Sequence, residues 1–280
     1  MTHPLLTAGA LALLASPLAA QTAATDLTRL DCGTIEVRWL NAFSDTFAYP
    51  GQQMILTNSC NLIRHGDELM IWDAGFPAAM IGAPAPEGPL VPSLSVDLVT
   101  QLAEVGVAPQ DVTKIGVSHY HFDHTGQATS FPQAELLIGA QDWAVLTADP
   151  LPASAGDFVV PETLAPWIAG AAPVTPVSGD FDVFGDGSVM MLDMPGHTPG
   201  STALLVNLAE TGPVLLSGDV VHFEEQIARD GVPGFNTDRA DSLASMGRMT
   251  ALAESLGATL VIQHDARHVD RLPTFPEAAK

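Results

Sequence analysis

Three histidines and an aspartate fall within six consecutive residues, in the segment His119-Tyr120-His121-Phe122-Asp123-His124. Imidazole and carboxylate groups are ligands of first-row metals such as zinc, manganese and iron. Residues 114–118 before this segment, with Ile115 and Val117 at alternate positions, predict a short buried strand. Side chains two positions apart on an extended backbone point the same way, so we expect His119 and His121 to bind one metal. Asp123 and His124 lie beyond the strand end and can face a second metal.

Three further polar residues follow or end short apolar runs that predict strands. They are His197 in residues 194–200, Asp219 in residues 215–219 and His264 in residues 260–265. Each alone is weak evidence, because a lone buried histidine is more often a hydrogen-bonded core residue and Ser-Gly-Asp is a common turn. If each strand delivers its polar residue to one edge of a sheet, the combined pattern predicts a metal site there.

The combined pattern His-x-His-x-Asp-His, Gly-His, Gly-Asp and a final His resembles the metallo-β-lactamase superfamily. The stretch Trp72-Asp73-Ala74-Gly75 is similar to that superfamily's early strand, which ends in Asp-Thr-Gly. The resemblance covers roughly residues 30–270. Within the superfamily it is closest to the N-acyl-homoserine lactonases, through residues 118–126, 195–200, 212–219 and 232–236. It implies an α/β (α+β) fold with four layers, an αββα sandwich.

The resemblance also implies two divalent metal ions and their ligands. His119, His121 and His197 would bind the first ion, Asp123, His124 and His264 the second, and Asp219 would bridge both. A hydroxide held between the two ions would attack a lactone or ester carbonyl. Asp123 would also pass a proton from the nucleophile to the leaving group. Zinc is the favoured metal, although cobalt, manganese and iron accept the same ligands.

Three residues next to the expected ligands allow a functional and a plain structural interpretation. Asp73 can orient a ligand imidazole by accepting its ring N–H, or cap a turn. Thr198 can act in the same way, although a turn role is simpler. His222 stands three residues after Asp219, where the lactonases that this chain resembles place a tyrosine that contacts the substrate carbonyl. We expect His222 to be a catalytic hydrogen-bond donor or general acid, with a surface histidine as the alternative.

The expected substrate is a small lactone or ester, with N-acyl-homoserine lactones first. Phosphotriesters, aryl esters and β-lactams are alternatives, because the same attack cleaves them. A non-hydrolytic iron oxidoreductase often has a single metal, and the second ligand set argues against it. Aromatic residues in or near the expected site loops could form its wall or pack in the core. These residues are Phe122, Trp143, Phe223 and Phe235.

The charge balance and the first twenty residues indicate where the protein works. The sequence carries 32 Asp and Glu against 10 scattered Lys and Arg, a formal net charge of −22. We therefore expect no binding to nucleic acid or to an anionic membrane. Residues 1–20 contain an uncharged Leu- and Ala-rich run and predict a signal peptide, although no Lys or Arg precedes the run. A hydrolase domain over residues 21–280 would then be periplasmic or secreted. The sequence does not decide whether the protein forms a homodimer.

The chain contains two cysteines, Cys32 and Cys60, and neither lies near a metal motif. In an oxidising compartment they could form a disulfide, since neighbouring antiparallel strands could bring them close. Two buried thiols that pack as small apolar groups are the alternative. The sequence leaves both interpretations open.

The elements that must position these residues alternate between strand and helix patterns. In the first half, strands are predicted over residues 34–40, 58–64, 68–73, 114–118 and 136–139. Residues 65–67 predict a hairpin turn. We expect one helix capped by Ser95 and stopped by Gly106, and another over residues 140–146. The Pro-, Ala- and Gly-rich residues 151–176 predict a long connection with one short helix at 163–169.

The second half repeats this plan. Strands are predicted over residues 180–184, 188–193, 202–208, 214–216 and 258–263. Asn236 or Thr237 can cap a helix with a single apolar stripe. The stripe consists of Leu243, Met246, Met249, Leu252 and Leu256. Two halves that each contain a sheet and helices favour two sheets packed face to face with helices outside, in agreement with the family resemblance.

Overall fold

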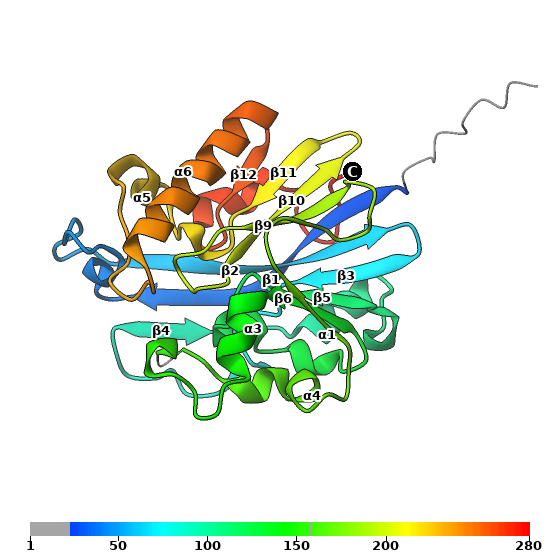
Figure 1. The fold of residues 1–280 in the computed structure, drawn as a ribbon, viewed down its shortest axis with the longest axis horizontal. Helices are drawn as coiled ribbons and strands as arrows, with labels where there is room; N and C mark the ends of the chain where they lie inside the picture. Colours follow the sequence, from blue (N-terminus) through cyan, green and yellow to red (C-terminus); the bar gives the residue numbers. More distant parts are fainter. Residues whose placement is uncertain (1–22, 157) are drawn as a thin grey trace, which may run out of the picture.

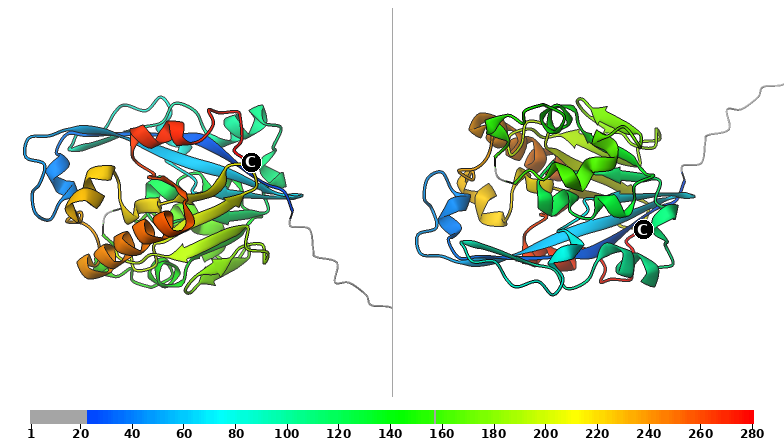
Figure 2. Two further views of the ribbon diagram at one scale, coloured as in Figure 1. Left: turned by 90° about the horizontal axis from the view of Figure 1, so that it is seen from above. Right: turned by 90° about the horizontal axis from the view of Figure 1, so that it is seen from below.

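Two mixed β-sheets lie face to face in the computed structural model, which describes residues 23–156 and 158–280. Helices cover the outer side of each sheet, and the long β1–β2 hairpin runs along the molecule (Figure 1). Figure 2 shows the same layers from two further sides. The predicted four-layer αββα architecture is confirmed. The predicted signal peptide lies outside the described residues, and no helix among those described is long and apolar enough to cross a membrane.

The first sheet contains seven strands in the order β4-β1-β2-β3-β5-β6-β7. Its strands are β1 (Thr25–Val37), β2 (Met54–His65), β3 (Glu68–Trp72), β4 (Leu90–Ser93), β5 (Lys114–Gly116), β6 (Glu135–Gly139) and β7 (Val174–Val177). The strands from β3 through β5 and β6 to β7 are parallel, and the other pairings are antiparallel. Its outer helices are α1 (Leu98–Glu104), α3 (Ala140–Leu146) and α4 (Ala165–Ile168).

The second sheet contains five strands in the order β12-β11-β10-β9-β8. Its strands are β8 (Phe181–Asp182), β9 (Val189–Asp193), β10 (Thr202–Leu208), β11 (Gly212–Leu216) and β12 (Thr259–Val261). Helix α6 (Arg239–Leu256) packs on its outer face. The remaining helices are the short α2 (Phe122–Thr125) and α5 (Glu224–Arg229). The 3₁₀ turns are η1 (Leu40–Phe43), η2 (Ala78–Met80), η3 (Pro109–Asp111), η4 (Ala128–Ser130), η5 (Ala153–Ala155), η6 (Pro161–Leu164), η7 (Gly218–Val220) and η8 (Ala266–Arg271).

Three apolar layers hold these elements together. The alternation of side chains along each strand sends one residue to the space between the sheets and the next to the outer helices. On β3, Met70 and Trp72 pack between the sheets, whereas Ile71 packs toward α1 and the other outer helices. On α6, Met246 and Met249 pack against the second sheet. Both faces of the central strands are buried. The ends of these strands, and the residues that directly follow them, are therefore held in fixed positions.

Several predicted element boundaries are wrong. Strand β1 covers residues 25–37 rather than 34–40, and β5 ends at Gly116 rather than at residue 118. Strand β7 forms inside the connection expected over residues 151–176 and joins the first sheet. The helix pattern of residues 140–146 and the strand pattern of residues 202–208 are confirmed.

Both predicted helix caps are also wrong. Asp97, not Ser95, caps α1 by accepting the Thr100 amide at 2.7 Å. Asp238 caps α6 through the Asp241 amide at 2.9 Å. Asn236 and Thr237, the caps expected for α6, instead bind His197 at the candidate site. Leu256, expected in the apolar stripe, is 44% exposed.

Cys32 and Cys60 form a disulfide that joins β1 to β2, with 5.7 Å between their Cα atoms. The structure therefore selects one of the two interpretations that the sequence left open. Gly75 packs against this disulfide with a φ angle of +60°. A Cβ at this position would lie 2.6 Å from Cys32 Sγ, so only glycine fits. The disulfide thus fixes the turn that directly follows Asp73.

Candidate metal centre

The candidate ligands follow the carboxyl ends of strands that meet at one edge of the sandwich. The segment 119–124 follows β5, His197 follows β9, Asp219 follows β11 and His264 follows β12. Strands β9, β11 and β12 run in the same direction, because β9 and β11 each pair antiparallel with β10 and β11 pairs parallel with β12. The Ser118 carbonyl accepts the Thr202 amide at 2.8 Å and joins the two sheets at this edge. The topology therefore brings together residues that are far apart in the sequence.

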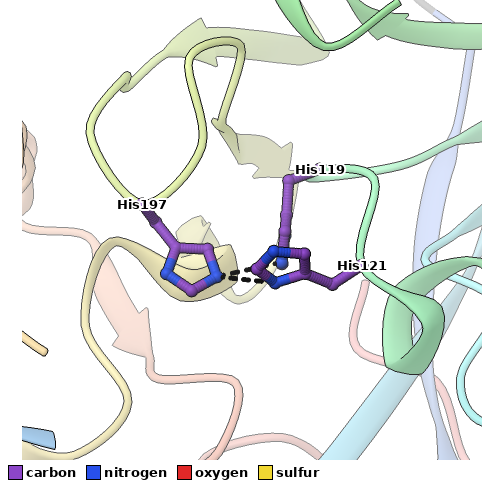
Figure 3. A group of neighbouring side chains, drawn as sticks. All are labelled: His119, His121 and His197. Carbon is purple, nitrogen blue, oxygen red and sulfur yellow. Dashed lines mark hydrogen bonds between the residues drawn. The ribbon is translucent and has the colours of Figure 1, made fainter. Parts of the chain in front are cut away.

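His119, His121 and His197 form a buried cluster of three imidazoles (Figure 3). His197 Nε2 lies 3.1 Å from His119 Nε2 and 3.0 Å from His121 Nδ1. The first two histidines come from the segment after β5, and His197 comes from the β9–β10 loop opposite. Three ring nitrogens that converge in this way can bind one metal ion.

Asp123, His124 and His264 form a second group beside the first. Asp123 Oδ2 lies 3.6 Å from His124 Nε2 and 3.8 Å from His264 Nε2. The side chain of Asp123 is 13% exposed, whereas those of His124 and His264 are almost completely buried. This group offers two nitrogens and one carboxylate, a mixture that zinc and other divalent metals accept.

Asp219 lies between the two groups and presents one carboxylate oxygen to each. Its Oδ2 lies 3.4 Å from His197 Nε2 and 3.8 Å from His119 Nε2. Its Oδ1 lies 3.0 Å from His264 Nε2 and 3.3 Å from His124 Nε2. A carboxylate in this position can be shared by two cations and can offset part of their mutual repulsion.

The electrostatics of the three-histidine cluster favour neutral rings. Burial and the neighbouring imidazoles hold the pKa values of His119 and His121 well below the usual range. Burial also lowers the pKa of His197 to about 4. Neutral imidazole is the form that binds a metal. These three histidines can therefore bind a metal at neutral pH without first losing a proton.

The second group is dominated by carboxylates. Burial acts to lower the pKa of His124, but Asp219, Asp123 and Asp73 raise it well above the usual value. The pKa of His264 is raised for a similar reason, because Asp219 and Asp123 outweigh burial. Burial acts to raise the pKa of Asp219, yet His264, His124 and His222 hold it well below the usual value. This pocket of negative charge stabilises a cation, whether a proton or a metal ion.

Two buried atoms indicate that a metal ion fits between these groups. His124 Nε2 and Asp219 Oδ1 have no hydrogen-bond partner within the described part of the chain. Leaving such groups unsatisfied costs free energy, so a native structure is expected to supply a partner. Both atoms point into the cluster, where a divalent cation would accept their lone pairs. The donor set therefore fits a two-metal site.

The opposite ring nitrogens of the histidines are held by hydrogen bonds, as is usual for metal ligands. His124 Nδ1 lies 2.9 Å from Asp73 Oδ2, and His264 Nδ1 lies 2.7 Å from the Thr57 carbonyl. His197 Nδ1 lies 2.9 Å from Asn236 Oδ1. These contacts fix each ring so that its other nitrogen points toward the cluster. The sequence suggested such a role for Asp73 but not for Asn236.

His222 packs directly against Asp219. Its Nε2 lies 3.2 Å from Asp219 Oδ2, and its ring stacks on His264 with 5.5 Å between centroids. Its Nδ1 is buried and has no hydrogen-bond partner among the described residues. The ring is 3% exposed, which contradicts the alternative of an ordinary surface histidine. His222 thus belongs to the same constellation as the expected ligands.

A cavity of about 280 Å³ opens onto Asp123, Asp219 and His222. Its wall is mainly apolar, and no lysine or arginine of the described chain lines it. The apolar part consists of Ile35, Phe43, Leu56, Phe76, Pro86, Leu90, Pro92, Phe122, Phe158 and Phe235. Of the four aromatic residues considered from the sequence, Phe122 and Phe235 line the cavity. Phe223 and Trp143 pack in apolar clusters instead.

Another group of metal-ligand residues, Glu224, Asp265 and His268, is already satisfied by ion pairs and hydrogen bonds. Arg271 and His268 both contact Glu224 Oε1, and Arg267 pairs with Asp265. His268 Nδ1 accepts the amide of Ile262 at 2.8 Å. This network connects the turn after His264 to the start of α5. Because its polar side-chain atoms already bind one another and nearby arginines, we do not assign it as a metal site.

Comparison with known proteins places this geometry in context. The sequence profile of the metallo-beta-lactamase superfamily matches residues 55–264. The N-acyl homoserine lactonase AttM of Azorhizobium caulinodans is 30% identical over 181 residues, which cover 64% of this chain and 67% of the relative. The N-acyl homoserine lactonase of Bacillus cereus is 27% identical over 237 residues, which cover 81% of this chain and 89% of the relative.

The fold is similar to that of an N-acyl homoserine lactone hydrolase solved with the product N-hexanoyl-L-homoserine at its catalytic metal centre. The TM-score is 0.77 at 22% identity, and the match covers 92% of this chain and 100% of the other. The dizinc quorum-quenching lactonase AidC matches with a TM-score of 0.65 at 17% identity, over 92% of this chain and 90% of its own. At these identities the structural matches support the fold.

Proposed function

This chain belongs to the metallo-β-lactamase superfamily and is a metallo-hydrolase, and on that premise we propose that it hydrolyses the ring ester of N-acyl-homoserine lactones. One observation carries the proposal: Asp219 bridges two groups of metal-ligand residues at the floor of an apolar cavity. Relatives that match 64–81% of the chain are N-acyl homoserine lactonases, which supports the same substrate class.

We assign the two metal sites as the resemblance to the superfamily implies them. The first would consist of His119, His121 and His197, the second of Asp123, His124 and His264, and Asp219 would be shared. Two divalent cations bound there would polarise the substrate carbonyl and make a water molecule acidic enough to attack it at neutral pH. We favour zinc, because the donor set is rich in imidazole and the similar lactonase AidC is a dizinc protein.

Asp123 is the best-placed residue to move a proton during ring opening. It lines the cavity and is the most exposed carboxylate of the cluster. Its carbonyl oxygen accepts the Asn58 side-chain amide at 2.7 Å, which holds the backbone in place below the substrate. We propose that its carboxylate accepts the proton of the attacking water and delivers it to the departing alkoxide.

His222 is proposed to donate a hydrogen bond to the substrate carbonyl oxygen as negative charge develops on it. Its ring lines the cavity beside Asp219 and makes an edge contact with Phe43, with 5.0 Å between centroids. An imidazole N–H at this position can do the work that a phenol does in the lactonases that the sequence resembles.

The cavity wall supports an uncharged substrate with an apolar group. Aromatic side chains such as Phe158 and Phe235, 5.9 Å apart between centroids, can pack on an acyl chain. No lysine or arginine of the described chain lines the wall, so away from the proposed metal ions it offers no permanent positive charge to an anionic substrate. Both features favour a neutral acyl lactone.

We also propose that the protein is exported and acts in the periplasm or outside the cell. The Cys32–Cys60 disulfide supports this location, because structural disulfides persist in oxidising compartments. A homodimer stays a prediction from the family resemblance.

The decisive test is ring opening of N-hexanoyl- and N-decanoyl-homoserine lactone by zinc-loaded protein, beside a phosphotriester, an aryl ester and a β-lactam. We expect the lactones to have the highest kcat/KM, and His119→Ala and Asp219→Asn to abolish turnover. Asp180→Asn, which removes an ion pair with Arg248 on the surface, is the matched control and should keep full activity. A higher kcat/KM for another substrate of the panel would replace the proposed function.

A further inference from the structure

Asp142 is a fully buried carboxylate that no sequence motif marks. It lies on α3, and both of its oxygens accept hydrogen bonds from the loop that carries His197. Its Oδ2 accepts the Thr198 hydroxyl at 2.7 Å, and its Oδ1 accepts the Gly200 amide at 2.6 Å. The backbone amide of Tyr120, on the segment after β5, lies near this carboxylate and favours its ionised form, which lowers the pKa of Asp142. Asp142 itself contacts none of the proposed ligands through these bonds.

The partners of Asp142 are the residues that flank the three histidines of the first site. Tyr120 stands between His119 and His121, and Thr198 directly follows His197. One carboxylate therefore binds the β9–β10 loop and lies near the segment after β5. The three histidines of the first site lie on these two segments, which are otherwise far apart in the sequence.

The local backbone is shaped to bring α3 to this position. A Cβ on Gly139 would lie 1.9 Å from the Gly200 carbonyl oxygen. A Cβ on Gly200 would lie 2.5 Å from the Asp142 amide nitrogen. Both positions therefore require glycine, and this lets the start of α3 touch the loop that carries His197. A loop pressed this closely against a helix cannot shift without breaking the bonds to Asp142.

We propose that Asp142 is a positioning residue that sets the distance between His197 and the His119–His121 pair, and thereby the affinity of the first metal site. This inference rests on the metal sites assigned in the proposed function. The metal affinity of the site formed by Asp123, His124 and His264 should depend on Asp142 much less, because Asp73 and Thr57 hold its histidines instead.

The chemistry of Asp142 argues against a role as simple core filling. Burying a carboxylate without a cation costs free energy, and no lysine or arginine in the described part of the chain forms an ion pair with it. An apolar side chain would fill the same space at lower cost. What a carboxylate adds here is the ability to accept the Thr198 and Gly200 hydrogen bonds while it lies near the Tyr120 amide of the other segment.

The test compares Asp142→Asn and Thr198→Val with a matched control at pH 8. In Asp142→Asn an NH₂ group replaces one acceptor and faces a donor, whereas Thr198→Val removes one donor and keeps the side-chain shape. The control is Glu135→Gln on β6, a carboxylate that accepts the Thr175 hydroxyl at 2.6 Å, pairs with Lys114 on β5 and has no hydrogen bond to residues 118–124 or 196–200. Stepwise zinc affinities are measured by chelator competition, and the sites are distinguished by the absorption spectrum of cobalt-substituted protein.

We expect Asp142→Asn to weaken one of the two metal-binding steps by about 10- to 100-fold and to change the cobalt spectrum, with a smaller loss in Thr198→Val. Glu135→Gln should bind both metals as the wild type does. Two results would overturn the inference: wild-type affinities and spectrum in Asp142→Asn, or equal weakening of both steps, as expected for general destabilisation. These readouts are independent of turnover, so a wild type that binds two metals but opens no lactone would refute only the proposed substrate.

Discussion

The carboxylate of Asp73 contacts the ring nitrogen of His124 that faces away from the metal-ligand cluster. Its Oδ2 lies 2.9 Å from His124 Nδ1, while its Oδ1 accepts the Ser118 amide at 2.7 Å. Asp73 achieves this with a φ angle of +57°, in the left-handed region that few residues other than glycine adopt. Backbone strain of this kind is retained where the surrounding structure demands it. Here it places both oxygens of one carboxylate where they fix a proposed ligand and the segment that carries it.

We therefore predict that Asp73→Asn weakens metal binding at the second site by about 10- to 100-fold. Asparagine tolerates a positive φ, so this variant keeps the backbone and removes one acceptor. Metal content after dialysis against limiting zinc is the measurement. Asp73→Ala, which loses both bonds, should show a larger defect, and full metal retention in both variants would show that Asp73 only shapes the turn.

The sequence could predict the proposed ligands because each lies in a short local pattern at the end of a strand. His119 is recognisable within its His-x-His-x-Asp-His segment, and His197 and Asp219 become recognisable once their patterns are combined with that segment. The residues that support them are not, since Asn236 contacts His197, and Asp142 contacts Thr198 beside it, only over long sequence distances. Asn236 even suggested a helix cap, because the same side chain can bind a backbone amide or an imidazole with equal ease.

The layers of the fold could be predicted for a similar reason, whereas the pocket wall could not. Alternating apolar residues specify strands one at a time, and two sheet-and-helix halves specify the sandwich. Phe43, at the end of η1, and Phe158 lie in connections between strands whose path depends on the finished structure. Trp143 was considered for the wall, but α3 directs it toward the core on the opposite side of the first sheet.

The disulfide should contribute measurably to stability. Cys32 and Cys60 are 28 residues apart, and closing a loop of this size stabilises a protein by about 3.5 kcal/mol through the unfolded chain. We predict that the double variant Cys32→Ala/Cys60→Ala lowers the free energy of unfolding by about 2–4 kcal/mol in urea titrations. Reductant should lower the wild-type stability and leave the double variant unchanged. Equal sensitivity of both proteins to reductant would contradict this prediction.

Asp142 should give the stability of the protein a distinctive pH dependence. Burial raises its pKa to about 7, although three hydrogen-bond donors favour the ionised form. The folded protein thus keeps a proton on Asp142 between about pH 4 and pH 7, where the unfolded chain has lost it. The stabilising contribution of this proton is complete below about pH 4 and is lost as the pH rises toward 7.

The measurement is the difference in unfolding free energy between wild type and Asp142→Asn, in the presence of a chelator so that both proteins titrate without metal. We predict that, as the pH rises from 5 to 7, the wild type loses unfolding free energy relative to Asp142→Asn by up to about 1 kcal/mol per pH unit. Asparagine does not titrate, so the other ionisable groups cancel in the comparison. A difference that stays constant over this range would show that Asp142 is ionised throughout.

His222 offers the sharpest test of the catalytic assignment, because a ligand role and a substrate role predict different defects. Its Nε2 lies 3.2 Å from Asp219 Oδ2, close enough that a metal bound by Asp219 and His197 could also reach it. If His222 instead donates a hydrogen bond to the developing oxyanion, His222→Ala should lower kcat for the lactone by about tenfold or more. KM and the number of bound metal ions should then change little.

The matched variant is His222→Tyr, which restores the side chain found in the lactonases that the sequence resembles. A phenol can donate the same hydrogen bond but is a weaker metal ligand than imidazole. We therefore expect His222→Tyr to recover most of the kcat that His222→Ala loses. Loss of one metal ion from both variants, measured alongside kcat, would instead make His222 a ligand, and unchanged kinetics with intact metal content would remove it from the mechanism.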